Sequence, residues 1–253
     1  MRSAFLLSLL AALLLIGPAA RAFTPFDAER LAERPVAAEG AARGVLFFGL
    51  APEAGRALAP TVPGPKAGLE AAKAALLRLE AADPAARAAL DRLRAAGRVV
   101  VVYDPSFPYP ALSRVTLAAF LPTDPKAADG RRFVTIVGRY GAQRPRDELA
   151  AVLAHELVGH GLQHLEGRLG AGVRVLDMEC EAMLATLAAR RALGLREDGP
   201  DGIDLRRAVE SRWCLDLRLW QADQAPETRA LWEADRLDLG ALLALFHRYQ
   251  AAR

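Results

Sequence analysis

The stretch His155-Glu156-Leu157-Val158-Gly159-His160 places two imidazoles on either side of a carboxylate, within a segment of helical character. Imidazole is the commonest protein ligand for zinc, and a glutamate beside the first ligand is where zinc hydrolases keep their general base. Three of the four histidines of the chain lie between positions 155 and 164. The cluster therefore predicts a metal site on this helix.

The spacing of the two histidines departs from the usual zinc helix, in which the ligands stand four residues apart. On a regular helix, positions i and i+5 differ by about 140°, too wide an angle for both side chains to reach one ion. A π-type turn brings these positions back over one another, and such turns are common at functional sites. Gly159 would ease the distortion because it has no Cβ. We therefore expect a π-type turn between His155 and His160.

Two other interpretations of the histidine cluster stay open at this point. On a regular helix, Glu156, His160 and His164 would share one face and could themselves bind a metal, with His155 turned away. Alternatively, the histidines fill ordinary helix positions and find hydrogen bonds. His164 is accordingly kept as an alternative ligand.

A second helix after the histidines offers further carboxylates. The stretch Leu176-Asp177-Met178-Glu179-Cys180-Glu181-Ala182 opens a run of high helical propensity that continues to residue 191. The Gly-rich segment 167–172 separates it from the first helix, so an antiparallel return is possible. A catalytic zinc site usually has three protein ligands. Periodicity does not choose among Asp177, Glu179 and Glu181.

Residues 155–160 and 178–182 resemble the H-E-L-L-G-H and E-E-C-R-A signatures of the dipeptidyl peptidase III family, zinc peptidases with the longer H-E-x-x-x-H spacing. The resemblance implies that Glu179 is the third ligand, beside His155 and His160, and that Glu156 is the catalytic base. It also implies one Zn²⁺ per chain and a peptide or protein substrate. The gap between the signatures is much shorter than in that family and closer to a thermolysin-like arrangement, so exopeptidase specificity is not implied.

The chain departs from this family pattern at Met178 and Glu181, where the family has Glu and Arg. The missing Glu is a candidate for orienting one of the ligands through a hydrogen bond. Another side chain must then take this role, and Asp177 is the candidate that the sequence offers.

The first residues have the pattern of a secretory signal peptide. Arg2 precedes an apolar run over residues 4–16, and small residues around Ala22 form a cleavage site. The apolar run is too short to span a bilayer comfortably. We therefore expect a signal peptide at residues 1–22, cleavage after Ala22, and a periplasmic or secreted protein without stable membrane insertion.

The two cysteines and the charges set further limits. Cys180 and Cys214 can form a disulfide in an exported protein, or remain as two small buried side chains. The formal net charge is +3, and basic residues are interleaved with acidic ones without a basic stripe, so nucleic-acid binding is not expected. The oligomeric state is not indicated.

The pattern along the chain predicts an α+β protein. Residues 23–66 form an N-terminal segment and a Pro-rich linker, and residues 67–253 form a single metallohydrolase-like domain. Helices are expected at 67–80 and 84–96, and strands at 98–103, 115–121 and 132–139. The result is a small mixed or antiparallel sheet of about three strands, followed by a zincin-like metal helix, a glutamate helix and a helical C-terminal region. The last strand, 132–139, is a candidate edge for an extended peptide.

The function predicted from these observations is that of an exported zinc-dependent metallopeptidase. In this prediction, Glu156 assists the attack of zinc-bound water on a peptide bond. The alternative is a non-catalytic exported metal-binding or structural protein of the cell envelope.

Overall fold

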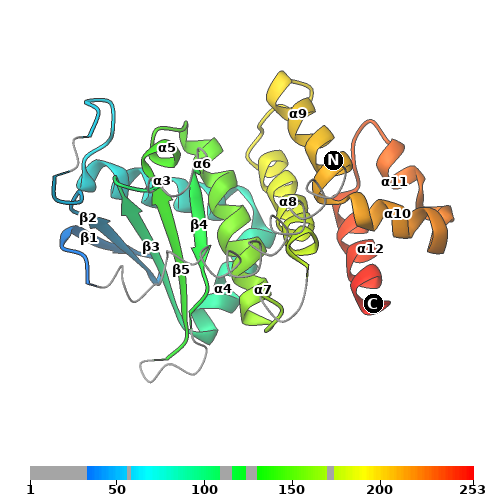
Figure 1. Ribbon diagram of the computed structural model, residues 1–253, viewed down its shortest axis with the longest axis horizontal. Coiled ribbons are helices and arrows are strands. Elements are labelled where there is room, and N and C mark those ends of the chain that lie inside the picture. The colour runs from blue at the N-terminus through cyan, green and yellow to red at the C-terminus, as the bar shows by residue number, and fades with distance from the viewer. Residues whose placement is uncertain (1–32, 56–57, 109–115, 124–129, 170–173) are drawn as a thin grey trace, which may run out of the picture.

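The computed structural model describes residues 33–55, 58–108, 116–123, 130–169 and 174–253. The signal peptide expected at residues 1–22 lies outside these ranges. A sheet with helices packed on it occupies one end of the molecule, and the C-terminal helices occupy the other (Figure 1). The predicted α+β class is confirmed, and of the two predicted kinds of sheet, mixed or antiparallel, the structure has the mixed one.

The sheet has five strands in the order β1-β2-β3-β5-β4. Neighbouring strands β2, β3 and β5 are parallel, whereas β1 and β4 join the two edges in antiparallel orientation. The bounds are β1 (Val36–Ala42), β2 (Val45–Leu50), β3 (Arg98–Asp104), β4 (Ala118–Leu121) and β5 (Arg132–Gly138).

Two features of the sheet correct the sequence-based prediction. It has five strands because residues 36–50 form a hairpin, although the alanine-rich first strand has only one β-branched side chain, Val36, to signal a strand. The expected edge strand, residues 132–139, is instead β5, which pairs on both sides. The short strand β4 forms the edge.

Helices cover one face of the sheet and form the main core. Helix α3 (Pro65–Ala82) extends two residues beyond the predicted range 67–80 at each end. The side chain of Asp83 caps α4 (Pro84–Ala96) by accepting hydrogen bonds from Ala85 and Ala86. The short helix α5 (Arg139–Ala142) leads from β5 to α6 (Arg146–Leu153), which packs against α3. The core combines side chains of alternating strand positions with the apolar faces of these helices: Val45, Phe47, Val99, Val101, Phe133, Leu69, Leu76, Leu90 and Leu153.

Helix α8 (Val175–Ala192) joins this core to a second one, built by the C-terminal helices. Ala189 and the following Leu193 belong to the first core, whereas Cys180, Leu184 and Leu187 belong to the second. The C-terminal region runs through α9 (Pro200–Ala208), the π-helical segment η4 (Val209–Trp213), α10 (Leu215–Gln224), η5 (Pro226–Thr228), α11 (Ala230–Glu233) and α12 (Leu239–Ala251).

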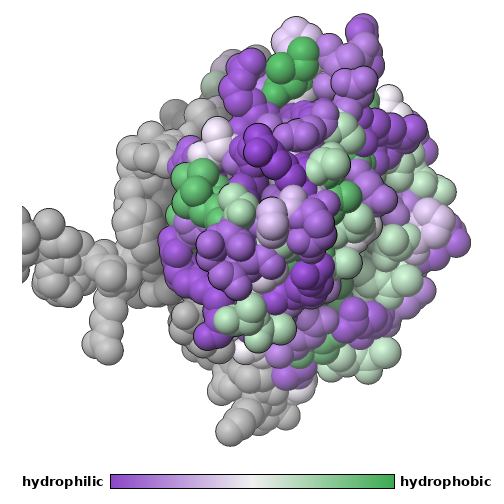
Figure 2. Space-filling model, turned by 90° about the vertical axis from the view of Figure 1, so that its right-hand side faces the viewer, coloured by the Kyte–Doolittle hydropathy of each residue, from purple (hydrophilic) through white to green (hydrophobic). Residues whose placement is uncertain are grey.

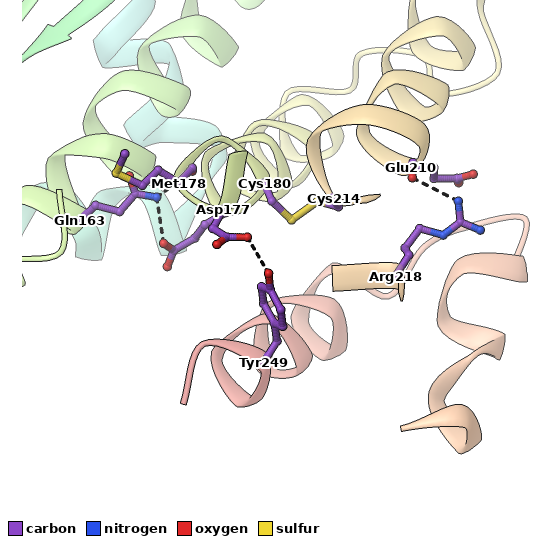
Figure 3. Close-up of a disulfide and its surroundings, with 9 residues drawn as sticks. Gln163, Asp177, Met178, Cys180, Glu210, Cys214, Arg218 and Tyr249 are labelled. Atoms are coloured by element: carbon purple, nitrogen blue, oxygen red, sulfur yellow. Dashed lines mark hydrogen bonds between the residues drawn. A yellow bond between two sulfur atoms is a disulfide. The ribbon is translucent and has the colours of Figure 1, made fainter. Parts of the chain in front are cut away.

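Covalent and polar contacts fasten α8 to these C-terminal helices (Figure 3). A disulfide joins Cys180 of α8 to Cys214, which lies between η4 and α10, so the disulfide reading of the two cysteines is confirmed. Asp177 is buried and accepts hydrogen bonds from the Tyr249 hydroxyl at 2.8 Å and from Arg253 at 2.7 Å. Burial and the neighbouring carboxylate raise the pKa of Tyr249 to about 12.

The end of the molecule formed by the C-terminal helices presents a mostly hydrophilic surface with small separate apolar patches (Figure 2). In the part of the chain that the structure describes, no helix has both the length and the apolar character needed to cross a bilayer.

Removing the disulfide should lower the stability of the fold. The cysteines are 34 residues apart, and closing a loop of this size stabilises a folded chain by about 3–4 kcal/mol in the chain-entropy model. We expect the Cys180→Ala/Cys214→Ala variant to lose roughly this free energy of unfolding, measured by denaturant titration. Wild-type protein reduced under native conditions should lose the same amount, and equal stability of reduced and oxidised protein would contradict the prediction.

Candidate metal centre

The histidine pair lies in a π-helical segment, η3 (Ala154–Gly161), which directly continues α6. This is the local geometry expected from the five-residue spacing. The wider turn brings the two imidazoles to the same side of the helix, with ring centroids 4.8 Å apart and planes almost perpendicular. The side chains of His155 and His160 are only 14 % and 12 % exposed. The regular-helix geometry, with residues 156, 160 and 164 on one face, is not the one adopted.

A close approach between η3 and α8 brings the carboxylate of Glu179 to the histidines. At Gly159, an added Cβ would lie 2.6 Å from the Cβ and 2.7 Å from the Cα of Ala182. The two backbones therefore touch where neither residue has a bulky side chain. One oxygen of Glu179 lies 3.4 Å from Nε2 of His155 and the other 3.6 Å from Nε2 of His160.

Hydrogen bonding fixes the orientation of the His155 ring. Its Nδ1 lies 3.1 Å from the hydroxyl oxygen of Thr186, and that hydroxyl donates its own proton to the carbonyl of Ala182 at 2.8 Å. The hydroxyl oxygen must then accept from Nδ1–H of His155. In the neutral ring, this leaves the lone pair on Nε2, the atom that faces Glu179.

The same reasoning applies to His160 and Gln163. The amide nitrogen of Gln163 donates to the carbonyl of Met178 at 2.8 Å and to Glu181 at 2.9 Å, so its oxygen faces Nδ1 of His160 at 2.9 Å. Nδ1–H of His160 donates to this oxygen, and Nε2 again keeps the lone pair. Both imidazoles thus present an unprotonated nitrogen to one point, beside a carboxylate. Such partners of ligand histidines set the tautomer in metal sites.

The geometry fits a metal ion. The ligand atoms of His155, His160 and Glu179 all lie within 4.8 Å of one another. Two imidazole nitrogens and one carboxylate oxygen form the ligand set of many catalytic zinc sites, which leave a fourth position open. The group can therefore hold a metal ion, and its donor types are compatible with zinc.

The electrostatics of the cluster favour positive charge between these side chains. Burial lowers the pKa of His155, but the carboxylates of Glu179 and Glu156 outweigh this effect and the pKa lies above its usual value. For Glu179, burial raises the pKa, but the two neighbouring imidazoles have the larger effect, and the pKa of this carboxyl lies below its usual range.

Glu156 sits beside the cluster with one oxygen already engaged. Its Oε2 accepts a hydrogen bond of 2.7 Å from the backbone N–H of Phe120 in β4. No other hydrogen bond to this carboxylate is found within the described ranges, and the residue lines the cleft in front of the histidines. The edge strand therefore orients the carboxylate and leaves its second oxygen for a group in the cleft.

Two residues considered from the sequence lie elsewhere. His164 is buried between the rings of Phe120 and Phe133, and burial together with Arg131 lowers its pKa. It packs as a neutral ring and does not join the metal cluster. Asp177 binds Tyr249 on α12 and Arg253 just after the end of this helix, so it does not orient either histidine.

The residues that orient the two candidate ligands His160 and His155 are Gln163 and Thr186, and the sequence analysis missed both. Their signal was positional: Gln163 follows His160 by three residues, and Thr186 follows Glu179 by seven, so each shares a helix face with a ligand.

The cluster opens into a cleft of about 700 Å³. Residues of β4 and α6 line it on one side and residues of α9 and η4 on the other, with α8 between them. Figure 1 shows α8 between α6 and α9. One face of α8 lines the cleft, beginning at the candidate ligand Glu179 and continuing through Met183, Thr186 and Arg190. A cleft of this size is typical of small-molecule or peptide sites.

Comparison of the chain with family models, with curated proteins and with solved structures gives no match. Arguments about its function therefore rest on the geometry of the site.

Replacing Thr186 with valine should weaken zinc binding without unfolding the protein. Valine keeps the shape of the side chain but removes the acceptor for Nδ1–H of His155. Loss of such a partner typically lowers metal affinity about 10- to 100-fold. A zinc dissociation constant from chelator competition tests this. Ser211→Ala is the matched control, because this hydroxyl also donates to a carbonyl four residues back but touches no histidine. Equal zinc affinity of Thr186→Val and wild type would refute the orienting role.

Replacing Gly159 with alanine should separate η3 from α8. The new methyl group would overlap Ala182, and such overpacking costs about 1–3 kcal/mol, more than the helix propensity gained by alanine. We expect lower unfolding free energy and weaker zinc binding. In Gly240→Ala, the matched helical control, the added Cβ meets only a side-chain oxygen at 3.5 Å, so stability should rise by up to about 1 kcal/mol. Equal effects at both glycines would contradict the close-packing argument.

Proposed function

We propose that this chain is an exported zinc-dependent metallopeptidase. The observation that carries the proposal is the convergence of two imidazole nitrogens and a carboxylate within 4.8 Å, with a second carboxylate, Glu156, beside them in a cleft. A structural metal site needs neither the second carboxylate nor an open cleft, whereas a hydrolase needs both.

The residues divide into ligands and a base. His155, His160 and Glu179 would hold the zinc ion through Nε2, Nε2 and a carboxylate oxygen. A zinc ion bound there would supply Lewis acidity for a substrate carbonyl and lower the pKa of a water ligand. The sequence resemblance to dipeptidyl peptidase III signatures supports the same assignment.

Glu156 would carry the proton during hydrolysis. Its free oxygen accepts the proton of the attacking water, and the resulting carboxylic acid donates it to the nitrogen of the leaving amine. The hydrogen bond from Phe120 N–H keeps the carboxylate turned toward the cleft throughout.

The open edge of β4 would hold an extended peptide beside Glu156. The carbonyl of Leu117 accepts from Gly138 N–H, so residues 117, 119 and 121 face β5, whereas the backbone groups of Ala118 and Phe120 face away from it. Phe120 N–H binds Glu156, and Ala118 lines the cleft. The main-chain groups of Ala118, which face away from β5, would pair with a substrate backbone in this proposal.

Export agrees with the covalent chemistry of the chain. A disulfide between Cys180 and Cys214 persists in an oxidising compartment, such as the periplasm or the extracellular space. The signal-peptide pattern of residues 1–22 supports the same location. A polypeptide of the cell envelope or its surroundings is then the substrate class.

Replacing Glu156 with glutamine should abolish peptide hydrolysis and leave zinc content near one per chain. The glutamine oxygen can still accept from Phe120 N–H, but the amide cannot accept the proton of water. Loss of a general base typically lowers the rate about 10²- to 10⁴-fold. Elemental analysis and turnover of a quenched-fluorescent peptide library measure the two quantities.

Glu179→Gln serves as the comparison, because it removes a charged ligand and should lower both zinc content and turnover. Full peptidase activity of Glu156→Gln would eliminate the proposed base. Zinc binding by wild type without any hydrolysis across the library would favour a non-catalytic metal-binding protein instead.

A further inference from the structure

The cleft has a second polar end, opposite the histidines. Helix α6 runs antiparallel to α8 along it, because Arg78 bonds both to Asp147 in the first turn of α6 and to the carbonyl of Leu193 after the last turn of α8. The cleft therefore extends from His155 and Glu179 at one end to Arg190 at the other.

Two arginines of the described ranges line this far end of the cleft: Arg144, which is paired with Glu148, and Arg190. Arg190 is half-buried, and no carboxylate within the described ranges lies at ion-pair distance from it. Besides Glu156 and Glu179, two acidic residues line the cleft: Glu148 is paired with Arg144 at 3.5 Å, and Asp201 is exposed on α9. A partly desolvated guanidinium without a counter-ion is costly, and an anionic ligand would offset that cost.

The neighbouring arginines do not share this property. Arg191 pairs with Glu197 at 2.5 Å, and Arg206 pairs with Glu210 at 2.7 Å. Arg190 differs from them in two ways: it lines the cleft, and no carboxylate among the described residues pairs with it.

The face of α8 that lines the cleft connects this cation to the ligand. Glu179, Met183, Thr186 and Arg190 are spaced by four, three and four residues and form one stripe. Eleven residues of helix span about 16 Å, and long side chains lean back toward the helix N-terminus. At about 3.3 Å per residue, an extended peptide covers roughly 10–16 Å in about three to five residues.

We propose that the cleft selects peptides carrying a carboxylate about three to five residues from the bond at the histidine cluster, and that Arg190 binds this carboxylate. The apolar side chains between the two ends, Val152, Met183, Leu205 and Trp213, would contact the intervening residues. The carboxylate belongs either to an acidic side chain or to the C-terminus of the peptide. This inference rests on the proposed peptidase function, because it takes the bound peptide to be the substrate.

Peptide binding to the zinc-loaded Glu156→Gln protein tests the proposal without turnover. The probes are blocked octapeptides of Ala and Leu with a single Glu or Gln at each position in turn, and one series with a free C-terminus. Calorimetry should give a dissociation constant about tenfold lower for the Glu peptide than for the Gln peptide at one position, or for the peptide with a free C-terminus than for the amidated one. The series that shows the preference identifies the source of the carboxylate.

Adding Arg190→Gln should bring this ratio to about one, while Arg190→Lys should retain part of it. Arg207→Gln is the control for the change in charge, because Arg207 is 71 % exposed and pairs with Asp204 outside the cleft. A ratio of one before any substitution, or a ratio unaffected by both Arg190 variants, would overturn the inference. If the glutamine variant does not fold, the lysine variant decides.

Zinc content and hydrolysis by the wild type are measured in parallel, so that the two proposals fail separately. Hydrolysis without a carboxylate preference would remove the role of Arg190 and leave the peptidase. A preference that depends on Arg190, with no hydrolysis of any of these peptides by the zinc-loaded wild type, would leave an acidic-peptide binding site and remove the peptidase.

Discussion

The contact between Gly159 and Ala182 is the constraint on which the candidate site depends. The backbones of η3 and α8 touch there, and a methyl group on Gly159 would already overlap the Cα of Ala182. Because protein interiors are close-packed, such a contact fixes the separation of two helices more strictly than flexible side chains can. The distances from Glu179 to His155 and His160 follow from it, since the three side chains start on the two helices that touch.

The three faces of helix α8 make different contacts. One face packs through Ala182 and Ala189 on the core beneath the sheet, and a second packs through Cys180, Leu184 and Leu187 on the C-terminal helices. The third face lines the cleft. The helix is therefore held from two sides, with a disulfide on one of them, while its polar stripe stays open. This rigid support suits a site whose ligands must converge on one point.

The sequence predicted the parts of this structure that rest on local patterns. The five-residue spacing of His155 and His160 required a π-type turn, and Asp83-Pro84 marked a helix boundary. It failed where tertiary contacts decide. The first strand of the hairpin, β1, has weak strand propensity and is held by pairing with β2, which in turn pairs with β3. The order of the strands, which puts β4 at an edge, cannot be predicted from the sequence of any single strand. Gln163 and Thr186 were missed because their partners come from other turns and helices.

Hydrogen bonds that start at Nδ1 of His160 connect the candidate metal site to the C-terminal helices. The side chain of Gln163 accepts a hydrogen bond from His160 and donates one to Glu181. Glu181 also accepts from Arg168 at 2.6 Å, and its carboxylate lies 3.1 Å from Nε2 of His247 on α12. Burial raises the pKa of Glu181, but these partners outweigh burial and keep it below the usual range, so the carboxylate stays charged. A fixed anion there holds the amide of Gln163 in one orientation. Glu181, a position at which this chain departs from the E-E-C-R-A pattern, therefore supports the tautomer of the candidate ligand His160 through Gln163. The contact of Glu181 with His247 on α12 makes this support depend on the folded C-terminal region.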